Sequence, residues 1–485
     1  MREDVVSRPQ VPWGVPVGIV LGAAMLVLIA AVANGSVTAG GRAGRWTPVA
    51  GSPFDQPPVF HSSDGELHAT LTAAERTIEV AGSPVKARVY NGLFTGPTLE
   101  VRPGDTMFIT LVNHLEEPTN LHVHGLHVSP VKPADDVFLE VAAGKTFTFR
   151  IHLPASEPPG LYWYHSHIHH MTEEQVFGGM SGMIVVDGLT KLLPQDLRSV
   201  TQRLFALRDI RVANGEVVKT GTVVKGTTRL VNSLFKPKLT IAPGETQLWR
   251  FANVGADIFY KVGLPTPNGP VTFHVVAEDG RPVWRVWNAT SLVLPPGKRY
   301  EVLVRGPAAG AYELKAQPYS QGVMNQRGSV ALASVTSKGP RQTPKALPTG
   351  LVPPEDLRDE TVAKSLTEVF QDGFTGGFTI NGKTFSPDRI DVRAKLGTVQ
   401  RWTLVNGSPE QHPFHIHTDY FQVISRNGEP FEANGLQDTV IIPTHGSVVI
   451  LIEFDDFVGK TVFHCHILAH EDHGMMATIQ ISKPS

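Results

Sequence analysis

Apolar and polar residues alternate along most of this chain after about residue 50, while long amphipathic helical patterns are scarce. Alternation with a period of two is typical of β-strands that bury one face. In the segments 90–114, 231–254 and 380–407, an asparagine opens a turn, an alternating strand follows, and a glycine turn leads to a second strand. In every copy this second strand ends at an asparagine nine residues after the turn glycine: Gly104 and Asn113, Gly244 and Asn253, Gly397 and Asn406. The repeated spacing predicts three related β-modules.

Each module also closes in the same way, on two adjacent alternating strands, in residues 144–167, 297–316 and 446–466. Paired strands of this kind build β-sandwiches, and three sandwiches of roughly 130–150 residues fit a chain of 485 residues. A polar, proline-rich stretch at 337–360 is typical of a linker. We therefore predict an all-β protein with an N-terminal segment and three domains, at residues 1–44, 45–190, 191–345 and 346–485.

The N-terminal segment differs from the rest of the chain. Residues 11–41 carry no charge, and residues 15–33 are almost wholly apolar. About 20 such residues can span a bilayer, and this stretch is long for the ~7–15-residue apolar region of a cleaved signal peptide. Residues 31–33, Ala-Val-Ala, fit a cleavage site. We expect export to an extracytoplasmic location, with the segment either cleaved or retained as a membrane anchor.

The composition excludes some partners. Charged residues make up 18% of the chain and the formal net charge is −2, without a long basic run, so nothing suggests a nucleic-acid partner. There is one cysteine, which rules out intramolecular disulfides, so the fold must depend on its core even outside the cell. Histidine, a common metal ligand, is abundant, with 20 residues.

Most informative are four histidine clusters, two in the first module and two in the third: His122 and His124; His165 and His167; His412, His415 and His417; His464, His466 and His470. On a strand, residues two apart face the same side about 7 Å apart, so a His-X-His pair offers ligands to two neighbouring metals. Only a site at the contact between these two modules can use all four pairs. The second module has no equivalent cluster, and we expect it to be a structural spacer.

The single cysteine, Cys465, lies between two of these histidines. Strand alternation points Cys465 to one face and both neighbours to the other, so the thiolate binds one metal while the histidines bind another centre. The peptide between them is then a short path for electrons. His412, His470 and Met475 complete a His₂Cys set with a weak axial methionine, which is typical of blue copper and unlike the cysteine-rich structural sites of zinc.

These motifs resemble those of multicopper oxidases, a family that includes laccases, bilirubin oxidases and cuprous oxidases. The resemblance covers nearly the whole chain after about residue 50, and segments 124–138 and 173–182 look most like the bacterial three-domain members. It implies three cupredoxin-like Greek-key β-sandwiches and four coppers per chain. A methionine-rich insert, which marks some cuprous oxidases, is absent.

The resemblance also implies roles for the ligands. The type 1 copper set is His412, Cys465, His470 and Met475; the type 2 pair is His122 and His415; the type 3 set is His124, His165, His167, His417, His464 and His466. The implied reaction is one-electron oxidation of a small reducing substrate (a phenol, an aromatic amine or a metal ion) coupled to four-electron reduction of O₂ to water. Glu471 and Asp135 are implied proton carriers, although Glu471 also fits a solvated loop charge and Asp135 fits turn chemistry after Pro133.

The motifs disfavour two other function classes. A non-enzymatic copper-binding or structural relative of the same fold is disfavoured by the intact ligand set. A copper nitrite reductase has two such modules and one histidine beside its cysteine, whereas this chain has three modules and two flanking histidines. Among the remaining histidines, His169, His170 and His473 lie beside motifs and are candidates for an access path, and the others, His127 among them, are expected to be surface or hydrogen-bonded residues. The electron donor and the oligomeric state stay open.

Overall fold

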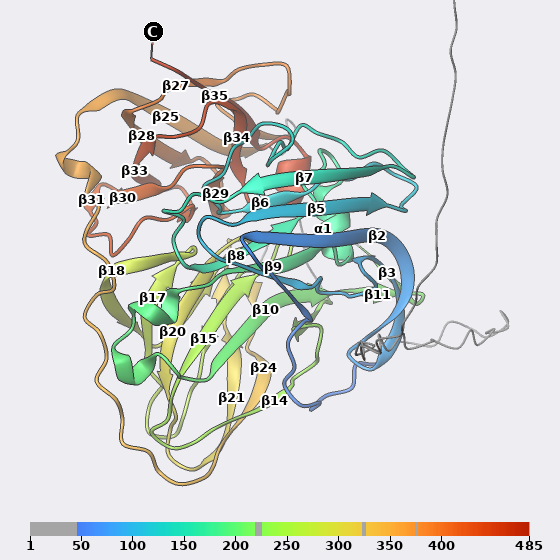
Figure 1. Cartoon of the computed structure of the whole chain (residues 1–485), viewed down its shortest axis with the longest axis vertical. Helices are drawn as coiled ribbons and strands as arrows, with labels where there is room; N and C mark the ends of the chain where they lie inside the picture. The colour runs from blue at the N-terminus through green and yellow to red at the C-terminus, as the bar shows by residue number, and fades with distance from the viewer. Residues whose placement is uncertain (1–45, 219–225, 323–325, 374–376, 485) are drawn as a thin grey trace, which may run out of the picture. The chain divides into compact units, whose positions relative to one another are not determined.

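The computed structural model describes residues 46–218, 226–322, 326–373 and 377–484 (Figure 1). The predicted signal or anchor segment lies outside these residues. Within the part that is described, no helix is both long and apolar enough to cross a membrane. The described chain is built mainly of strands, which confirms the all-β prediction.

The first pair of sheets has strand orders β1-β4-β9-β8-β6 and β11-β12-β3-β2-β5-β7. Its strands are β1 (Val59–His61), β2 (Glu66–Val80), β3 (Ser83–Tyr90), β4 (Thr98–Val101), β5 (Thr106–Asn113), β6 (His122–His124), β7 (Thr146–His152), β8 (Gly160–His165), β9 (Ser181–Val186), β11 (Val212–Ala213) and β12 (Glu216–Val217). Along β5 every second residue is buried, and Ile109 and Leu111 pack with residues of both sheets in one core. The predicted alternation therefore buries one face of the strand.

The second pair has orders β13-β10-β15-β20-β17-β18 and β14-β24-β21-β16-β19, beside a two-stranded hairpin β22-β23. Its strands are β10 (Gln202–Ile210), β13 (Thr228–Val231), β14 (Lys238–Ile241), β15 (Thr246–Asn253), β16 (Tyr260–Gly263), β17 (Phe273–Glu278), β18 (Arg281–Ala289), β19 (Leu292–Leu294), β20 (Arg299–Arg305), β21 (Gly310–Gln317), β22 (Tyr319–Ser320), β23 (Gln326–Arg327) and β24 (Val330–Ser337). Trp249 and Phe251 lie in the core of this pair.

The third pair has orders β26-β25-β28-β33-β30-β31 and β27-β35-β34-β29-β32. Its strands are β25 (Val362–Gly373), β26 (Gly377–Ile380), β27 (Val392–Lys395), β28 (Thr398–Asn406), β29 (His412–Ile416), β30 (Phe421–Arg426), β31 (Glu429–Pro430), β32 (Thr439–Ile442), β33 (Ser447–Phe454), β34 (Gly459–Cys465) and β35 (Met476–Ser482). Trp402 and Phe414 pack in its core together with Cys465.

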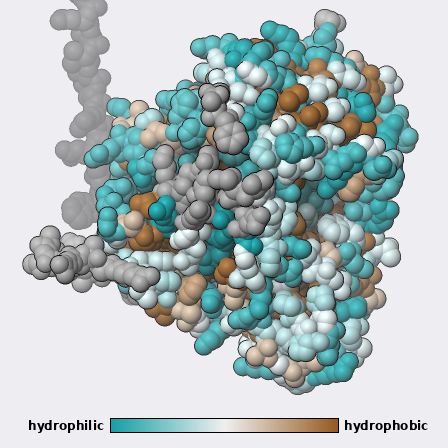
Figure 2. Space-filling model, turned by 180° about the vertical axis from the view of Figure 1, so that it is seen from behind, coloured by the Kyte–Doolittle hydropathy of each residue, from teal (hydrophilic) through white to brown (hydrophobic). Residues whose placement is uncertain are grey.

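Short helices connect some of the strands. They are α1 (Thr172–Gly178), α2 (Leu189–Leu192) and α3 (Leu468–Asp472), with single 3₁₀ turns at Gln195–Leu197 and Leu357–Asp359. Hydrophilic residues cover most of the face in Figure 2, with hydrophobic residues scattered in small groups. Most large apolar side chains are instead buried, many of them in the three cores.

The repeated asparagines have a common structural role. In the first module, Asn113 donates from Nδ2 to the carbonyls of Glu117 and Val141 and accepts from the Leu115 N–H. Asn253 and Asn406 make the equivalent three hydrogen bonds in the other two modules. Each amide thus satisfies backbone groups where a buried strand ends, since unpaired buried polar groups are costly. Three sheet pairs with the same asparagine hydrogen bonds agree with the prediction of three modules. The exact boundaries of the modules remain predictions.

Candidate metal centres

Two strand pairs carry most of the predicted ligands. Strand β6 pairs with β8 so that His122 lies opposite His165, and β29 pairs with β34 so that His415 lies opposite His464. The two pairs meet face to face across the contact between the first and third sheet pairs. The His124 and His415 rings stack with centroids 3.7 Å apart, and the His122 and His417 rings stack at 3.8 Å. Stacking thus brings together histidines almost 300 residues apart in sequence.

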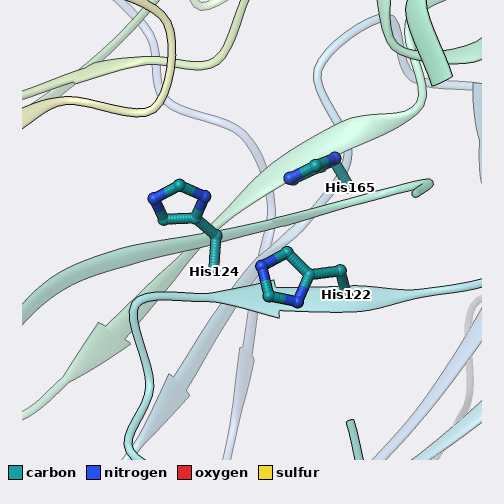
Figure 3. A group of neighbouring side chains, drawn as sticks. All are labelled: His122, His124 and His165. Atoms are coloured by element: carbon teal, nitrogen blue, oxygen red, sulfur yellow. The ribbon is translucent and has the colours of Figure 1, made fainter. Parts of the chain in front are cut away.

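Eight imidazoles gather at this contact, all of them buried: His122, His124, His165, His167, His415, His417, His464 and His466. The Nε2 atom of His464 lies 3.2 Å from Nε2 of both His167 and His417. Likewise, Nε2 of His466 lies 3.2 Å from Nδ1 of His124. Figure 3 shows His122 and His124 from one strand together with His165 from the neighbouring strand, with their rings gathered in one space. So many converging ring nitrogens form a strong candidate for a metal cluster.

The outer nitrogens of several rings are held by oxygens. Nδ1 of His165 lies 2.7 Å from the Ser166 carbonyl and Nδ1 of His415 lies 2.9 Å from the Asp438 carbonyl, so each Nδ1–H donates and Nε2 keeps its lone pair. These two Nε2 atoms, and that of His122, are buried without a hydrogen-bond partner among the described residues. Burial lowers the pKa of His122 and His165 well below the ordinary value, which favours neutral imidazole, the ligand form. The donor set therefore fits metal ions.

A second group lies on the other face of β34. Its centre is Cys465, whose Sγ is 3.5 Å from Nδ1 of His412 and 3.7 Å from Nδ1 of His470, while the two Nδ1 atoms are 3.3 Å apart. Met475 is buried in the same core, and its carbonyl accepts the Cys465 N–H. Burial raises the pKa of the Cys465 thiol, so loss of its proton requires a cation nearby. Two nitrogens and one sulfur at these distances match the His₂Cys pattern of blue copper.

Both predicted proton carriers are buried beside the imidazole cluster. Glu471, on α3, has Oε2 3.0 Å from Nδ1 of His464 and Oε1 3.6 Å from Nε2 of His167. Burial alone would raise the pKa of Glu471, but the charges of His167 and His464 offset it and lower the pKa to about 2. Asp135 accepts hydrogen bonds from Nδ1 of His122, at 2.9 Å, and from the Val123 N–H, and burial raises its pKa to about 8.

Three residues beside the cluster were missed by the sequence analysis: Asp438 and Gly297, which contact its rings, and Arg299, which pairs with Asp438. Asp438 has Oδ1 3.2 Å from Nε2 of His124 and pairs with the buried guanidinium of Arg299 from β20. Gly297, with a positive φ of 86°, lies so close that a Cβ there would be 3.0 Å from the rings of His124 and His466. Arg299 and Gly297 belong to the range predicted to be a spacer, and neither sits in a ligand-like motif. Their contact with the cluster depends on the packing of the modules, which carries no local sequence signal.

The histidines outside the motifs have separate places. His169 lines a cavity of about 190 Å³ with His167, Phe385 and Val462, next to the imidazole cluster. Nδ1 of His170 lies 2.9 Å from the Asp472 carbonyl, and Nδ1 of His473 lies 2.6 Å from the Ala469 carbonyl. An access path near these residues remains a prediction.

Comparison with known proteins agrees with this geometry. Three family models, each described as multicopper oxidase, match residues 72–191, 193–338 and 355–485. A multicopper oxidase (mco) of Staphylococcus haemolyticus is 28% identical, over 81% of this chain and 83% of its own. A bilirubin oxidase of Albifimbria verrucaria is 28% identical, over 80% of this chain and 71% of its own. The cell division protein FtsP of Escherichia coli is also 28% identical, over 83% of this chain and 86% of its own.

Among solved structures, a multicopper oxidase from Campylobacter jejuni, described as a metallo-oxidase, superposes with a TM-score of 0.79 at 27% identity, covering 89% of this chain and 96% of that chain. A buried thiol with two imidazoles, next to an eight-imidazole cluster on an all-β scaffold, defines a copper-dependent oxidoreductase. The chain belongs to the multicopper oxidase family. It is a copper enzyme that oxidises a reducing substrate and passes the electrons to O₂, which confirms the predicted cupredoxin-like fold, cofactor and enzyme class.

Proposed function

We propose that His412, Cys465, His470 and Met475 hold a type 1 copper, and that the eight clustered imidazoles hold three further coppers, with His122 and His415 at the type 2 position. The other six histidines, His124, His165, His167, His417, His464 and His466, then hold the type 3 pair. Copper supplies the one-electron redox steps at both centres. The rest of the proposal concerns what the protein's own residues do around it.

One observation carries this assignment. Cys465 faces His412 and His470, while its neighbours His464 and His466 face the imidazole cluster on the opposite side of the same strand. Two peptide units therefore link the thiolate to two ligands of the other centre. This covalent connection provides a short route for single electrons from the donor side to the O₂ side.

Protons reach the buried cluster, on this proposal, through Glu471. Its carboxylate touches His464 and His167 and lies on α3, the helix that also carries His470. Reduction of O₂ to two waters consumes four protons, and a buried carboxylate within hydrogen-bond reach is suited to deliver them. Asp135 holds Nδ1–H of His122 and so fixes the orientation of that ring; we assign it a second proton-handling role.

The donor is expected to deliver electrons near His470, whose ring is stacked on Phe378 at 4.2 Å between centroids. We propose a phenol, an aromatic amine or a metal ion as the donor class. The apolar N-terminal stretch supports export, so the enzyme acts outside the cytoplasm, free or anchored through residues 15–33.

Oxygen uptake tests the proposal directly. Copper-loaded protein is supplied in turn with a phenol, an aromatic amine, Cu(I), Fe(II) and Mn(II), and O₂ consumption is compared with donor oxidation. We expect four donor electrons per O₂ with at least one donor, and none with Cys465→Ser. Uptake that yields peroxide, or an equal rate in the Cys465→Ser variant, contradicts the proposed route. Absence of uptake with full copper content favours the non-enzymatic relative.

A further inference from the structure

A cavity of about 330 Å³, with none of the proposed copper ligands in its lining, lies where segments of all three sheet pairs meet. His127, which follows β6, lines it together with Glu157, from the loop before β8, and with Asp455 and Asp456, from the turn between β33 and β34. The sequence analysis places His127 among surface or hydrogen-bonded histidines. Its side chain is in fact 13% exposed and surrounded by carboxylates.

The hydrogen bonding of His127 determines which ring nitrogen can bind a cation. Nδ1 lies 2.7 Å from the Thr418 carbonyl, an acceptor only, so Nδ1 must carry the proton. In the neutral ring Nε2 then holds a lone pair. This atom is buried, has no hydrogen-bond partner among the described residues, and faces Oδ1 of Asp455 and Oδ2 of Asp456. A lone pair facing two carboxylates is repulsive unless a cation lies between them.

The distances favour a metal ion over a proton in that position. Nε2 is 3.6 Å from Asp455 Oδ1 and 3.4 Å from Asp456 Oδ2. An N–H···O hydrogen bond would be about 2.7–3.2 Å long. Metal bonds of about 2.1 Å at tetrahedral angles instead separate neighbouring donor atoms by about 3.4 Å. The cavity also has room for a water as a fourth ligand, since one water occupies about 30 Å³.

Independent support comes from two buried carboxylates beside the ring. Glu157 is 2% exposed and borders the cavity, and its Oε2 has no hydrogen-bond partner among the described residues. Asp419 is also 2% exposed, and neither of its carboxylate oxygens has a hydrogen-bond partner among the described residues. Its Oδ1 is 4.0 Å from His127 Nδ1. The cavity lining includes one guanidinium, Arg281, which already pairs with Glu355 at 2.8 Å. Carboxyl groups thus outnumber cationic side chains in the lining of this cavity, which suits it to a divalent cation.

We propose that His127 Nε2, Asp455 and Asp456 bind one divalent transition-metal ion of the zinc type, in addition to the coppers. Asp419 and the Thr418 carbonyl orient the ring from its Nδ1 edge, as oxygens do for metal-bound histidines. The ion ties the loop after β6 to the β33–β34 turn, and so connects the first and third modules beside their shared copper cluster. None of its ligands belongs to the copper set.

Zinc is the probe, because mass spectrometry distinguishes it from copper. Copper-loaded, full-length protein is dialysed against graded Zn²⁺, and zinc and copper are counted per chain, with Tm measured in parallel. We expect one zinc above the unchanged copper count, with a rise in Tm because the ion binds the folded state. Asp455→Asn with Asp456→Asn should weaken zinc binding at least tenfold and abolish that rise. These two side chains are more than half exposed, so the variant should fold.

His68→Gln is the matched control, since His68 and Glu66 form an exposed histidine–carboxylate pair with 2.8 Å between Nε2 and Oε2. It should bind zinc as the unaltered protein does. The proposal is overturned if copper-loaded protein takes up no zinc, if zinc enters only as copper leaves, or if the double variant binds zinc as tightly as the control. The first outcome would mean that a proton, not a metal, sits between His127 and the two aspartates.

Discussion

Arg299 donates two parallel hydrogen bonds to Asp438, from Nη2 to Oδ2 at 2.6 Å and from Nη1 to Oδ1 at 2.9 Å. Both side chains are buried, and Oδ1 also lies 3.2 Å from Nε2 of His124. The pair therefore joins β20 of the second sheet pair to the residue just before β32 of the third sheet pair. It lies directly against His124 of the first sheet pair. A bidentate, desolvated pair at this point sets the position of the imidazole cluster.

Removing one partner should be costly. We expect Asp438→Asn to lower the free energy of unfolding by about 3–5 kcal/mol, because the buried Arg299 would lose its bidentate partner and keep only Asp279, at 3.6 Å, which it shares with Lys298. Denaturant unfolding of the copper-loaded protein measures this. Asp187→Asn, which removes an exposed pair with Lys191 at 3.1 Å, should cost less than about 1 kcal/mol.

The same pair predicts a pH dependence. Burial would raise the pKa of Asp438, but Arg299 and His415 more than offset it and lower the pKa below the usual range. A carboxyl with a lowered pKa stabilises the fold above its unfolded pKa of about 3.9, and the contribution is lost as pH falls below that value. Unfolding free energies from pH 6 to 3 should therefore fall more steeply in the unaltered protein than in Asp438→Asn. Parallel slopes would contradict this account.

Cys465→Ser should remove the intense blue absorption and one copper while sparing the other three. The reason is that the thiolate belongs to the His412–His470 group alone, on the face of β34 opposite the imidazole cluster. Visible absorption and a copper count by mass spectrometry test this. Retained blue colour in this variant would show that Cys465 is not a ligand of the blue copper.

Met475→Leu should keep the blue centre and raise its reduction potential, because loss of a weak sulfur donor destabilises Cu(II) relative to Cu(I). A redox titration followed at the blue band measures the shift. Met476→Leu is the matched control, because Met476 begins β35 and lines the 190 Å³ cavity. The reduction potential of the blue centre should stay unchanged in this variant. A fall in potential in Met475→Leu argues against axial ligation.

Glu471→Gln should slow reoxidation of the fully reduced enzyme by O₂, while reduction of the type 1 centre by donor stays unchanged. The amide preserves shape but cannot exchange a proton as the carboxyl does, and a group acting in the limiting step contributes ~10²–10⁴-fold. Stopped-flow reoxidation between pH 5 and 8 is the measurement, with exposed Glu429→Gln as control. Equal rates at intact copper content would leave Glu471 a structural partner of His464.

Asp135→Asn should likewise slow reoxidation, and it should also weaken copper retention about 10–100-fold, because Asp135 fixes the His122 ring. Copper retained after dialysis against a chelator separates this from a purely proton-carrying role. Asp136→Asn is the adjacent control: Asp136 accepts the Phe138 N–H and touches no ligand in the described contacts. A variant that holds copper normally but reoxidises slowly would restrict Asp135 to proton transfer.

The local periodicity of the sequence determined the strands, the number of modules and the side of the strand that Cys465 faces. The period of two predicts strands, the repeated glycine–asparagine spacing predicts three modules, and the same period puts Cys465 opposite His464 and His466. These are short-range consequences of backbone geometry, so they can be read without knowing the fold. The ligand motifs also carry the family resemblance, because each is contiguous.

The histidine motifs predict that the first and third modules meet, but the individual contacts between modules were decided only by the tertiary structure. Nothing local indicates that His124 stacks on His415, that Arg299 pairs with Asp438, or that His127 faces Asp455 and Asp456, since each contact joins strands or loops far apart in the chain. The histidine neighbours that lower the pKa of Glu471 against the effect of its burial, and the burial that raises the pKa of the Cys465 thiol, arise from the same packing. Sequence determined which side chains were available as ligands, and the meeting of the modules determined their distances, charges and partners.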